Sequence, residues 1–253
     1  MTDDSKLNEE IVEAIPEQLQ ILFEDDHYVA VYKPVGLLVH RSWIAKEATQ
    51  FALQILRDQI GQYVYPVHRL DRPTSGVLIM AKSSEAARRL SEQFAAQHID
   101  KQYLALVRGY IEGEHQLDYP LKEKLDKMVD AKAQQDKPAQ SALTFYTGLQ
   151  KAELPYPSGK FATSRYSLVS LKPKTGRKHQ LRRHMHHLSH HIIGDTTYGD
   201  GRHNRLFREL GLPGLWLFSK QLIFVHPYTD NEIIIDCPLP ERWKQLFKRM
   251  SWK

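Results

Sequence analysis

The hydrophobic positions along the chain change period several times, and the short apolar or alternating segments stand in groups. These segments predict strands at 21–23, 28–32, 77–81, 103–107, 143–146, 166–171, 216–225 and 233–235. Apolar residues at helical spacing predict helices at 48–60, 84–97 and 240–250. Strands in groups, without regular β-α-β alternation, are typical of an α+β fold. We therefore predict a mixed, mostly antiparallel central sheet that is flanked by helices and loops.

The chain shows no sign of division into two folded units. Its 253 residues suit one large domain, and no repeat or linker interrupts the pattern. We predict an acidic N-terminal arm at 1–20 and a single domain at 21–253. The mixed-charge stretch 122–137, KEKLDKMVDAKAQQDK, is expected to form an exposed helix or excursion.

Charge is distributed unevenly. The formal net charge is +5, yet residues 1–26 carry −8, so the remaining residues carry +13. A positive body predicts a polyanionic partner such as a nucleic acid, and the alternative is a basic protein with a solvated lysine surface. The acidic segment either solvates the N-terminus or covers part of the basic face.

Composition narrows the class of protein and its compartment. Hydrophobic residues make up 42% and charged residues 26%, which excludes a disordered or fibrous chain. One cysteine, Cys237, permits neither an intramolecular disulfide nor a cysteine-based zinc site. No run of 18 apolar residues predicts a membrane span, and the acidic start MTDDSKLNEE is unlike a secretory signal. We therefore expect a cytoplasmic protein.

The densest group of reactive residues is HRLDRPTSG at 68–76, directly before a predicted strand. It places Asp71 between Arg69 and Arg72, and neighbouring guanidinium groups favour an ionised carboxylate. An ionised aspartate on a rigid loop can act as a nucleophile or a base. The alternative is an Asx turn, in which Asp71 caps the loop and the arginines face solvent.

A second group, at 172–191, holds six Lys and Arg residues, six histidines and no acid. Its first residues, KPKTG, predict a turn that opens a helix, and a helix N-terminus suits phosphate. Leu181, Met185 and Leu188 form an apolar stripe on this helix. Arg182 lies beside the stripe, so we expect it to point inward and to pair with Asp71.

The same run contains histidine pairs four residues apart, at 186/190 and 187/191, a spacing that can hold zinc. No H-E-x-x-H motif accompanies them, and the cations nearby would repel a metal ion. We therefore expect no metal site, and a phosphate-facing or solvated histidine face instead. No phosphate-binding glycine motif is present, so no nucleotide cofactor is expected.

Tyr103 lies on an alternating strand within 101–109, KQYLALVRG. It is either a packing tyrosine or an aromatic platform for a nucleobase. The residues leave both alternatives open.

Together these segments resemble the pseudouridine synthases of the RluA type. The matching blocks are 32–37, 68–76, 101–109, 172–184 and 192–199, and HRLD followed by TSG is the most specific of them. Further likeness at 38–42, at Arg72-Pro73, at Arg182-Arg183 and at 203–205 points to the members that modify uridine 65 of tRNA. The small N-terminal RNA-binding domain of several ribosomal-RNA relatives has no counterpart in the chain.

The resemblance implies a pseudouridine synthase fold and a cofactor-free, metal-free isomerase that acts on tRNA as a monomer. Asp71 matches the catalytic aspartate, Arg182 its arginine partner, and Tyr103 the tyrosine that stacks on the target uracil. We also expect Tyr103 to help remove the proton from carbon 5 of the base. The residues expected to bind substrate are Arg69, which would fill the gap left by the flipped base, together with Arg72, Thr74, Arg177, Lys178, His179, Gln180 and Leu181.

Two departures from the family pattern concern local packing. His190-His191 stands where the family often has His-Pro, and Leu217-Phe218-Ser219 where it often has Leu-His-Ala. Two alternatives for function stay open. One is a pseudouridine synthase that acts on ribosomal RNA, and the other is a non-catalytic RNA-binding protein that uses the basic face.

Overall fold

The computed structural model describes residues 15–40, 49–123, 138–157 and 160–252. The strands are β1 (Ile21–Glu24), β2 (Tyr28–Lys33), β3 (Tyr65–Pro66), β4 (Ser75–Ala81), β5 (Asp100–Arg108), β6 (Glu114–Asp118), β7 (Leu143–Leu154), β8 (Ser164–Pro173), β9 (Leu217–Val225) and β10 (Glu232–Asp236). The helices are α1 (Ala52–Ile60), α2 (Ser84–Ala95), α3 (Gln180–His187), α4 (Gly201–Glu209) and α5 (Glu241–Met250).

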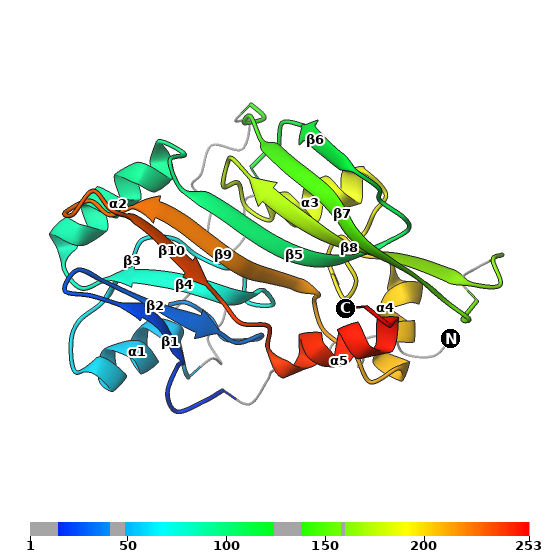
Figure 1. Ribbon diagram of the computed structural model, residues 1–253, viewed down its shortest axis with the longest axis horizontal. Helices are drawn as coiled ribbons and strands as arrows, with labels where there is room; N and C mark the ends of the chain where they lie inside the picture. Colours follow the sequence, from blue (N-terminus) through cyan, green and yellow to red (C-terminus); the bar gives the residue numbers. More distant parts are fainter. Residues whose placement is uncertain (1–14, 41–48, 124–137, 158–159, 253) are drawn as a thin grey trace.

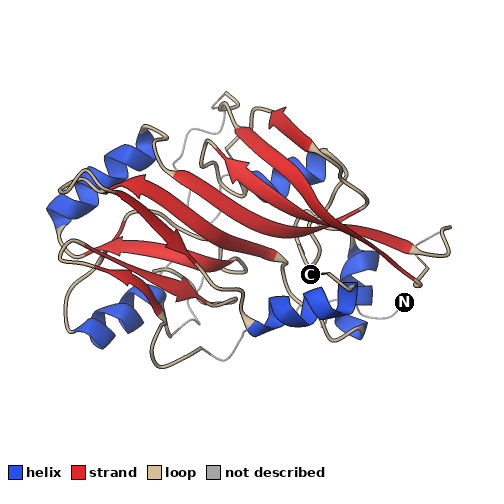
Figure 2. Cartoon of the chain, viewed as in Figure 1, coloured by secondary structure: helices blue, strands red, loops and turns tan. Residues whose placement is uncertain are grey.

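The ten strands of the described residues form one sheet (Figure 1). Its order is β1-β2-β4-β9-β5-β8-β7-β6, while β3 pairs with β4 and β10 with β9. The β4–β9 pair is parallel and the other pairs are antiparallel. Helices α1 and α2 lie towards one end of the sheet, and α4 and α5 towards the other (Figures 1 and 2). The predicted α+β fold is confirmed. No helix in the described ranges is long and apolar enough to cross a membrane.

Each predicted strand is found, but several boundaries differ. The helix predicted at 48–60 begins at Ala52, because Phe51 is extended with φ −137°. The helix predicted at 84–97 ends at Ala95, and Gln97 has a left-handed φ of 61°. Residues 1–14 of the predicted arm and 124–137 of the predicted excursion lie outside the described residues. The division into an arm and one domain stays a prediction.

Strands β3 and β6 and helix α4 were not predicted from the sequence, for a shared reason. Strand β6, EHQLD, is a polar, exposed strand at the edge of the sheet. Helix α4 buries His203 and Asn204 along with Phe207, so its buried face is largely polar. Strand β3 is two residues long. In none of these elements does an apolar period mark the buried side.

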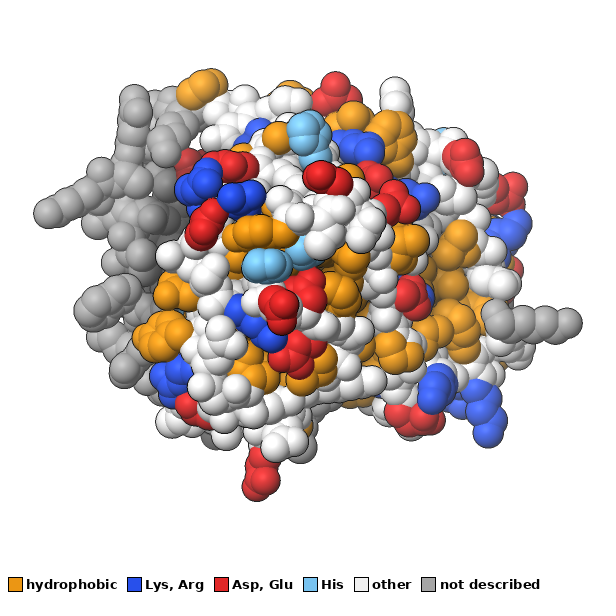
Figure 3. Space-filling view, turned by 60° about the vertical axis from the view of Figure 1, so that its left-hand side comes forward, with side chains coloured by type: hydrophobic (Ala, Val, Ile, Leu, Met, Phe, Trp, Pro, Cys, Tyr) orange, Lys and Arg blue, Asp and Glu red, His pale blue; other side chains and the backbone are white. Residues whose placement is uncertain are grey.

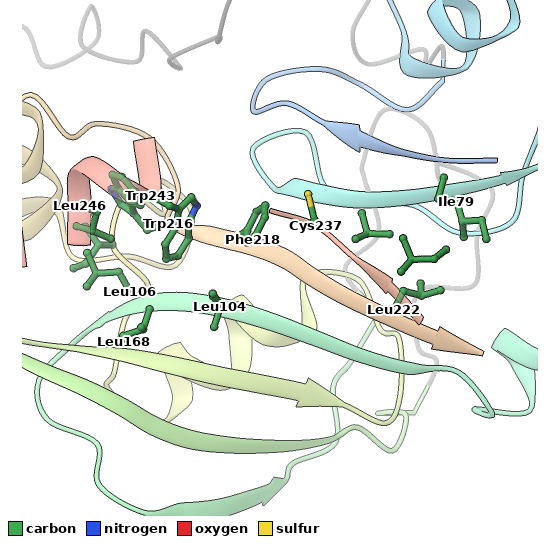
Figure 4. Close-up of a cluster of buried hydrophobic side chains, with 14 of the residues drawn as sticks. Ile79, Leu104, Leu106, Leu168, Trp216, Phe218, Leu222, Cys237, Trp243 and Leu246 are labelled. Atoms are coloured by element: carbon green, nitrogen blue, oxygen red, sulfur yellow. The ribbon is translucent and has the colours of Figure 1, made fainter. Parts of the chain in front are cut away.

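The two faces of the sheet pack against different partners. Alternation along β5 sends Leu104 and Leu106 into a cluster that contains Trp216 and Trp243 (Figure 4). The buried thiol of Cys237 lies in the same cluster.

The opposite face carries a second cluster, in which Ala105 and Val107 of β5 pack with Met185 of α3. Tyr103 continues this face towards the start of β5 and also packs against the cluster around α1. Strand parity therefore places Tyr103 on the same side of the sheet as α3.

Gly76 allows the parallel contact between β4 and β9. Its φ is +116°, and a Cβ atom there would lie 2.1 Å from the carbonyl oxygen of Ser219. The two strands pair at Ser75↔Phe218 and Gly76↔Ser219. The glycine of the TSG motif is therefore required by a backbone contact. Further along β4, the Ile79 N–H donates to Nε2 of His68 over 3.1 Å, and the His68 ring stacks on Phe94.

We expect Gly76→Ala to lower the free energy of unfolding by about 3 kcal/mol or more, because it combines a backbone clash with an unfavourable φ. Gly61→Ala is the matched control: Gly61 also has a positive φ, 63°, but nothing lies within 4 Å of the added Cβ. Urea unfolding of both variants separates the clash from the strain. Equal losses of stability would show that the β4–β9 contact tolerates a side chain.

Candidate active site

A cavity of about 500 Å³ lies where the loop before β4, the start of β5 and the segment before α3 meet. All but one of the residues predicted to act on substrate line this cavity. They are Asp71, Tyr103, Arg182, Arg69, Thr74, Arg177, Lys178, His179, Gln180 and Leu181. Arg72 is the exception. The fold therefore brings together two motif blocks that are about a hundred residues apart in the chain.

The carboxylate of Asp71 points towards cationic and polar side chains of the cavity. Its Oδ2 lies 3.3 Å from Nη1 of Arg182, and its Oδ1 lies 3.7 Å from Nε2 of His179. The loop turn is closed by the backbone, since the Thr74 N–H donates to the carbonyl oxygen of Asp71 over 2.9 Å. The Asp71 side chain is 28% exposed. The geometry thus favours a carboxylate that faces the cavity over one that caps the loop.

The predicted pair of Arg182 and Asp71 is found, but Arg182 has a second and closer partner, Asp195, that was not predicted. Nε and Nη2 of Arg182 donate to the two carboxylate oxygens of Asp195 over 2.7 and 2.8 Å, and both side chains are buried. Asp71 receives the remaining contact from Nη1. Arg182 therefore bridges two carboxylates, one wholly buried and one that reaches the cavity.

Asp195 is held in place by more than Arg182. Its Oδ1 also accepts the N–H groups of Thr197 and Tyr198, each over 2.9 Å. Burial alone would raise the pKa of Asp195, but the Arg182 guanidinium and these N–H groups hold that pKa below its usual value. The sequence analysis compared the block 192–199 with the family but assigned Asp195 no role. A buried arginine that needs a buried acid was the available signal.

Tyr103 forms a wall of the cavity and is also part of the core. Burial raises the pKa of its hydroxyl to about 12, the hydrogen bond with the Ser219 side chain lowers it, and the negative charge of Asp71 raises it. The phenol is therefore neutral near pH 7. Ser219 stands at a position where the sequence departs from the family pattern, so this departure supplies a partner for Tyr103.

The basic loop before α3 is held by Gln180. Its Oε1 accepts from the Thr175 hydroxyl and the Arg177 N–H, and its Nε2 donates to Leu143 and Thr144 of β7. The predicted turn at 172–176 is wrong in part, because Lys172 and Pro173 belong to β8. The helix opens only at Gln180, after His179 in a left-handed conformation. The side chain of Gln180 thus fixes the loop that presents Arg177 and Lys178.

Arg72 does not line the cavity, and it joins the loop that carries Asp71 to the residues that follow β2. Its Nε donates to the Gly36 carbonyl over 3.1 Å, and its own carbonyl accepts the Gly36 N–H. The buried Lys33 ammonium donates to the carbonyls of Pro34, Leu37 and Arg72. The geometry gives Arg72 a place in supporting the loop, and its contact with substrate stays a prediction.

The histidine pairs do not form the helical spacing that suggested zinc. Helix α3 ends at His187, and Nδ1 of His190 donates to the Arg108 carbonyl. His186 and His191 both bond the Tyr198 carbonyl, and His187 stacks on Tyr119. Among the described residues, no three His, Cys, Asp or Glu side chains converge on a point that could hold a metal ion.

Cationic side chains surround the cavity, where Arg69, Lys101, Arg177, Lys178 and Arg182 all contribute to the lining. In contrast, the face in Figure 3 mixes acidic, basic and hydrophobic side chains. The described residues therefore place five Lys and Arg side chains at this one cavity.

Comparison with known proteins defines the class. Residues 27–187 match the sequence profile of the RNA pseudouridylate synthases, and the chain belongs to this family. Curated relatives include tRNA pseudouridine synthase C of Vibrio vulnificus strain CMCP6, which is 57% identical over 92% of this chain and 96% of the relative. The protein of that name from Haemophilus influenzae strain Rd is 54% identical over 93% of this chain and 99% of the relative.

Solved structures support the same class. Human RNA Pseudouridylate Synthase Domain Containing 4 is 26% identical with a TM-score of 0.68, over 92% of this chain and 93% of that one. Human RNA Pseudouridylate Synthase Domain Containing 1 shares the fold, with a TM-score of 0.69 at 23% identity over 96% and 98% of the two chains. The predicted enzyme class is confirmed: the chain is an RNA pseudouridine synthase, and the alternative of a non-catalytic RNA-binding protein is not supported.

We expect Asp195→Asn to lower the free energy of unfolding by about 3 kcal/mol, because it leaves the buried Arg182 without its strongest partner. Turnover of the folded fraction should also fall, since Arg182 would no longer be fixed beside Asp71. Asp236→Asn is the control, because Asp236 forms an exposed pair with Lys220 and should change stability by less than about 1 kcal/mol. Urea unfolding and steady-state turnover check both effects. Equal behaviour of the two variants would remove Asp195 from the support of the site.

Proposed function

We propose that this enzyme converts one uridine of tRNA, at position 65, to pseudouridine, with Asp71 as the catalytic carboxylate. The observation that carries the proposal is the position of Asp71, which is paired with a buried arginine and reaches a cavity walled by Tyr103. The printed names of relatives at 54 and 57% identity support tRNA as the substrate class.

The reaction is an isomerisation that needs no external reactant. The bond between N1 of uracil and C1′ of ribose breaks, the ring turns, and a bond forms between C5 and C1′. The proton of C5 is lost and N1 gains one, so atoms and charge balance. A carboxylate can start this sequence by attacking the ribose, by attacking the base, or by taking the proton from C2′. The partly exposed Asp71 carboxylate lines the cavity, and each of these three first steps is compatible with that position.

Arg182 places a positive charge beside the Asp71 carboxylate that would carry out this chemistry. Its guanidinium is held by Asp195 and directs one N–H group at the Asp71 carboxylate, which orients that carboxylate in the cavity. Asp195 neutralises the charge of Arg182 in the protein interior. Asp71 therefore does not have to be buried in order to neutralise that charge. The reacting oxygen can therefore remain accessible to substrate.

Tyr103 offers its ring to the uracil and keeps its phenolic proton near pH 7. Because the pKa of this hydroxyl is about 12, it can accept the C5 proton only if it gives up its own proton in the same step. Stacking on Tyr103 requires no such transfer and is the simpler of the two roles.

The target uridine must leave its stack to reach Asp71, at a cost of a few kcal/mol. Arg69 is exposed at the mouth of the cavity, where it can enter the space that the base vacates. Arg177 and Lys178, on the loop before α3, are placed to meet phosphate groups. Binding that depends on such contacts weakens as the salt concentration rises.

Asp71→Asn should reduce turnover by roughly 10³-fold or more, because the amide has no negative charge with which to attack or to accept a proton. The measurement is tritium release from tRNA that is labelled at carbon 5 of uridine and taken from cells lacking this gene. Mapping of the product then tests position 65. Release by Asp71→Asn at the wild-type rate would refute the mechanism. Release from labelled ribosomal RNA, and not from tRNA, would transfer the same chemistry to the other substrate.

Tyr103→Phe keeps the ring and removes the hydroxyl, so it separates stacking from proton transfer. If stacking is the main role, kcat should fall by less than about tenfold, whereas Tyr103→Ala should lose far more. Single-turnover tritium release with both variants measures this difference. A loss in Tyr103→Phe as large as that in Tyr103→Ala would assign the C5 proton to the hydroxyl.

A further inference from the structure

A second hollow of about 260 Å³ adjoins the active-site cavity. The two hollows share Lys101 and Pro173, so they meet where β5 begins and β8 ends. None of the roles assigned above to catalytic or substrate-binding residues uses this second hollow.

An aromatic ring and three ammonium groups line the second hollow. Phe145 of β7 is 36% exposed and pairs in register with Lys172 of β8. Lys101 and Lys174 complete the cationic lining. One acid, Asp100, belongs to the lining as well, and its carboxylate lies 2.7 Å from Nζ of Lys174. The charged side chains of the lining therefore leave a positive surplus, which is complementary to phosphate.

We propose that this hollow, called here the Phe145 groove (Phe145, Lys101, Lys172 and Lys174), binds a nucleotide that flanks the target uridine. The flanking base stacks on Phe145, and its phosphate lies against the lysines. The proposal rests on the proposed function in one respect, namely that RNA enters the cavity with its target base flipped. Exposed aromatic rings beside a cationic track are the usual means of binding single-stranded RNA without sequence preference.

Strand geometry allows an RNA chain to reach both hollows. Lys101 lies two residues from Tyr103 on β5, about 7 Å along the strand. Tyr103 pairs with Leu171, so Lys172, the next residue of β8, points to the opposite face of the sheet. Because β5 starts and β8 ends at this place, a chain that leaves the cavity can pass over the end of the sheet into the groove.

Base flipping gives the groove a physical purpose. Extrusion of the target uridine removes one stacking neighbour from the adjacent base. Phe145 can replace that neighbour and so offset part of the cost of flipping. The amides of Gln102 and Gln221, which also line the hollow, donate to Ser170 and Asp236. Stacking and charge therefore dominate the recognition, and we expect the groove to tolerate any flanking base.

The test compares Phe145→Ala with a matched control on the same strand, Leu149→Ala, whose side chain is 45% exposed. Turnover is measured on unmodified tRNA labelled at carbon 5 of uridine. We expect Phe145→Ala to raise KM about tenfold with little change in kcat, Phe145→Trp to restore KM, and Leu149→Ala to match wild type. Urea unfolding of each variant establishes that the proteins compared are folded.

A binding measurement makes the groove testable apart from catalysis. A fluorescently labelled hexauridylate is titrated with each protein, and anisotropy reports the Kd at several salt concentrations. Lys172→Gln should reduce the slope of log Kd against log salt by about 0.7, the contribution of one phosphate contact to a single strand. A merely structural lysine would leave this slope unchanged.

The outcomes separate the groove from the proposed function. If wild type modifies tRNA while Phe145→Ala and Leu149→Ala share the same KM and Kd, the groove is refuted and the proposed function stands. If wild type modifies neither tRNA nor ribosomal RNA, the proposed function fails. The hexauridylate titration then decides whether the Phe145 groove binds RNA. Weaker binding by Phe145→Ala alone then supports the groove, and equal binding by both variants refutes it.

Discussion

The site depends on a buried arginine that lies between two carboxylates. A guanidinium that is 5% exposed must be neutralised inside the protein, and Asp195 does this through two short hydrogen bonds. The remaining Nη1 group is then available to Asp71, at the edge of the cavity. The loop before β4 must meet helix α3 and the segment that follows it for this to occur, although Asp71 and Arg182 are 111 residues apart in the chain. The ion pairs therefore link the correct fold to the orientation of the Asp71 carboxylate.

The rest of the fold around the cavity holds the Asp71 loop from several sides. Lys33 and Gly36 bind its carbonyl at Arg72, and the Thr74 N–H closes the turn at Asp71 itself. Gly76 then joins the loop to β9 through a contact that excludes any side chain. Each of these contacts uses the backbone, which explains why a motif with one reactive carboxylate extends over nine residues.

The sequence predicted the strands well, because β2, β4, β5, β8 and β9 are apolar or alternating and are buried as their patterns require. It predicted the residues of the cavity through the motif blocks and the family resemblance. It failed where burial is polar. Helix α4 has a largely polar buried face, so no apolar period marks it in the sequence. Asp195 is buried because it pairs with Arg182, and hydrophobic patterning does not reveal such a pair. Arg72 was expected to bind substrate because it is a cation beside Asp71; the structure adds a bond from its Nε to the Gly36 carbonyl, and its contact with substrate stays a prediction. Pairings of this kind depend on long-range contacts that spacing along the chain does not encode.

Because the reaction neither consumes nor releases a second reactant, the protein contributes chiefly through position and electrostatics. The structure is consistent with this demand. Gln180, His68 and Asp195 direct their polar atoms at other groups of the protein, which fixes the walls of the cavity. The Asp71 carboxylate is the exception, since it is held on one side and 28% exposed on the other. In the proposed mechanism, a base that enters between Tyr103 and Asp71 therefore meets a preorganised surface, and little reorganisation is needed when charge develops during the reaction. The binding free energy of the surrounding RNA is then left to offset the cost of removing the uridine from its stack.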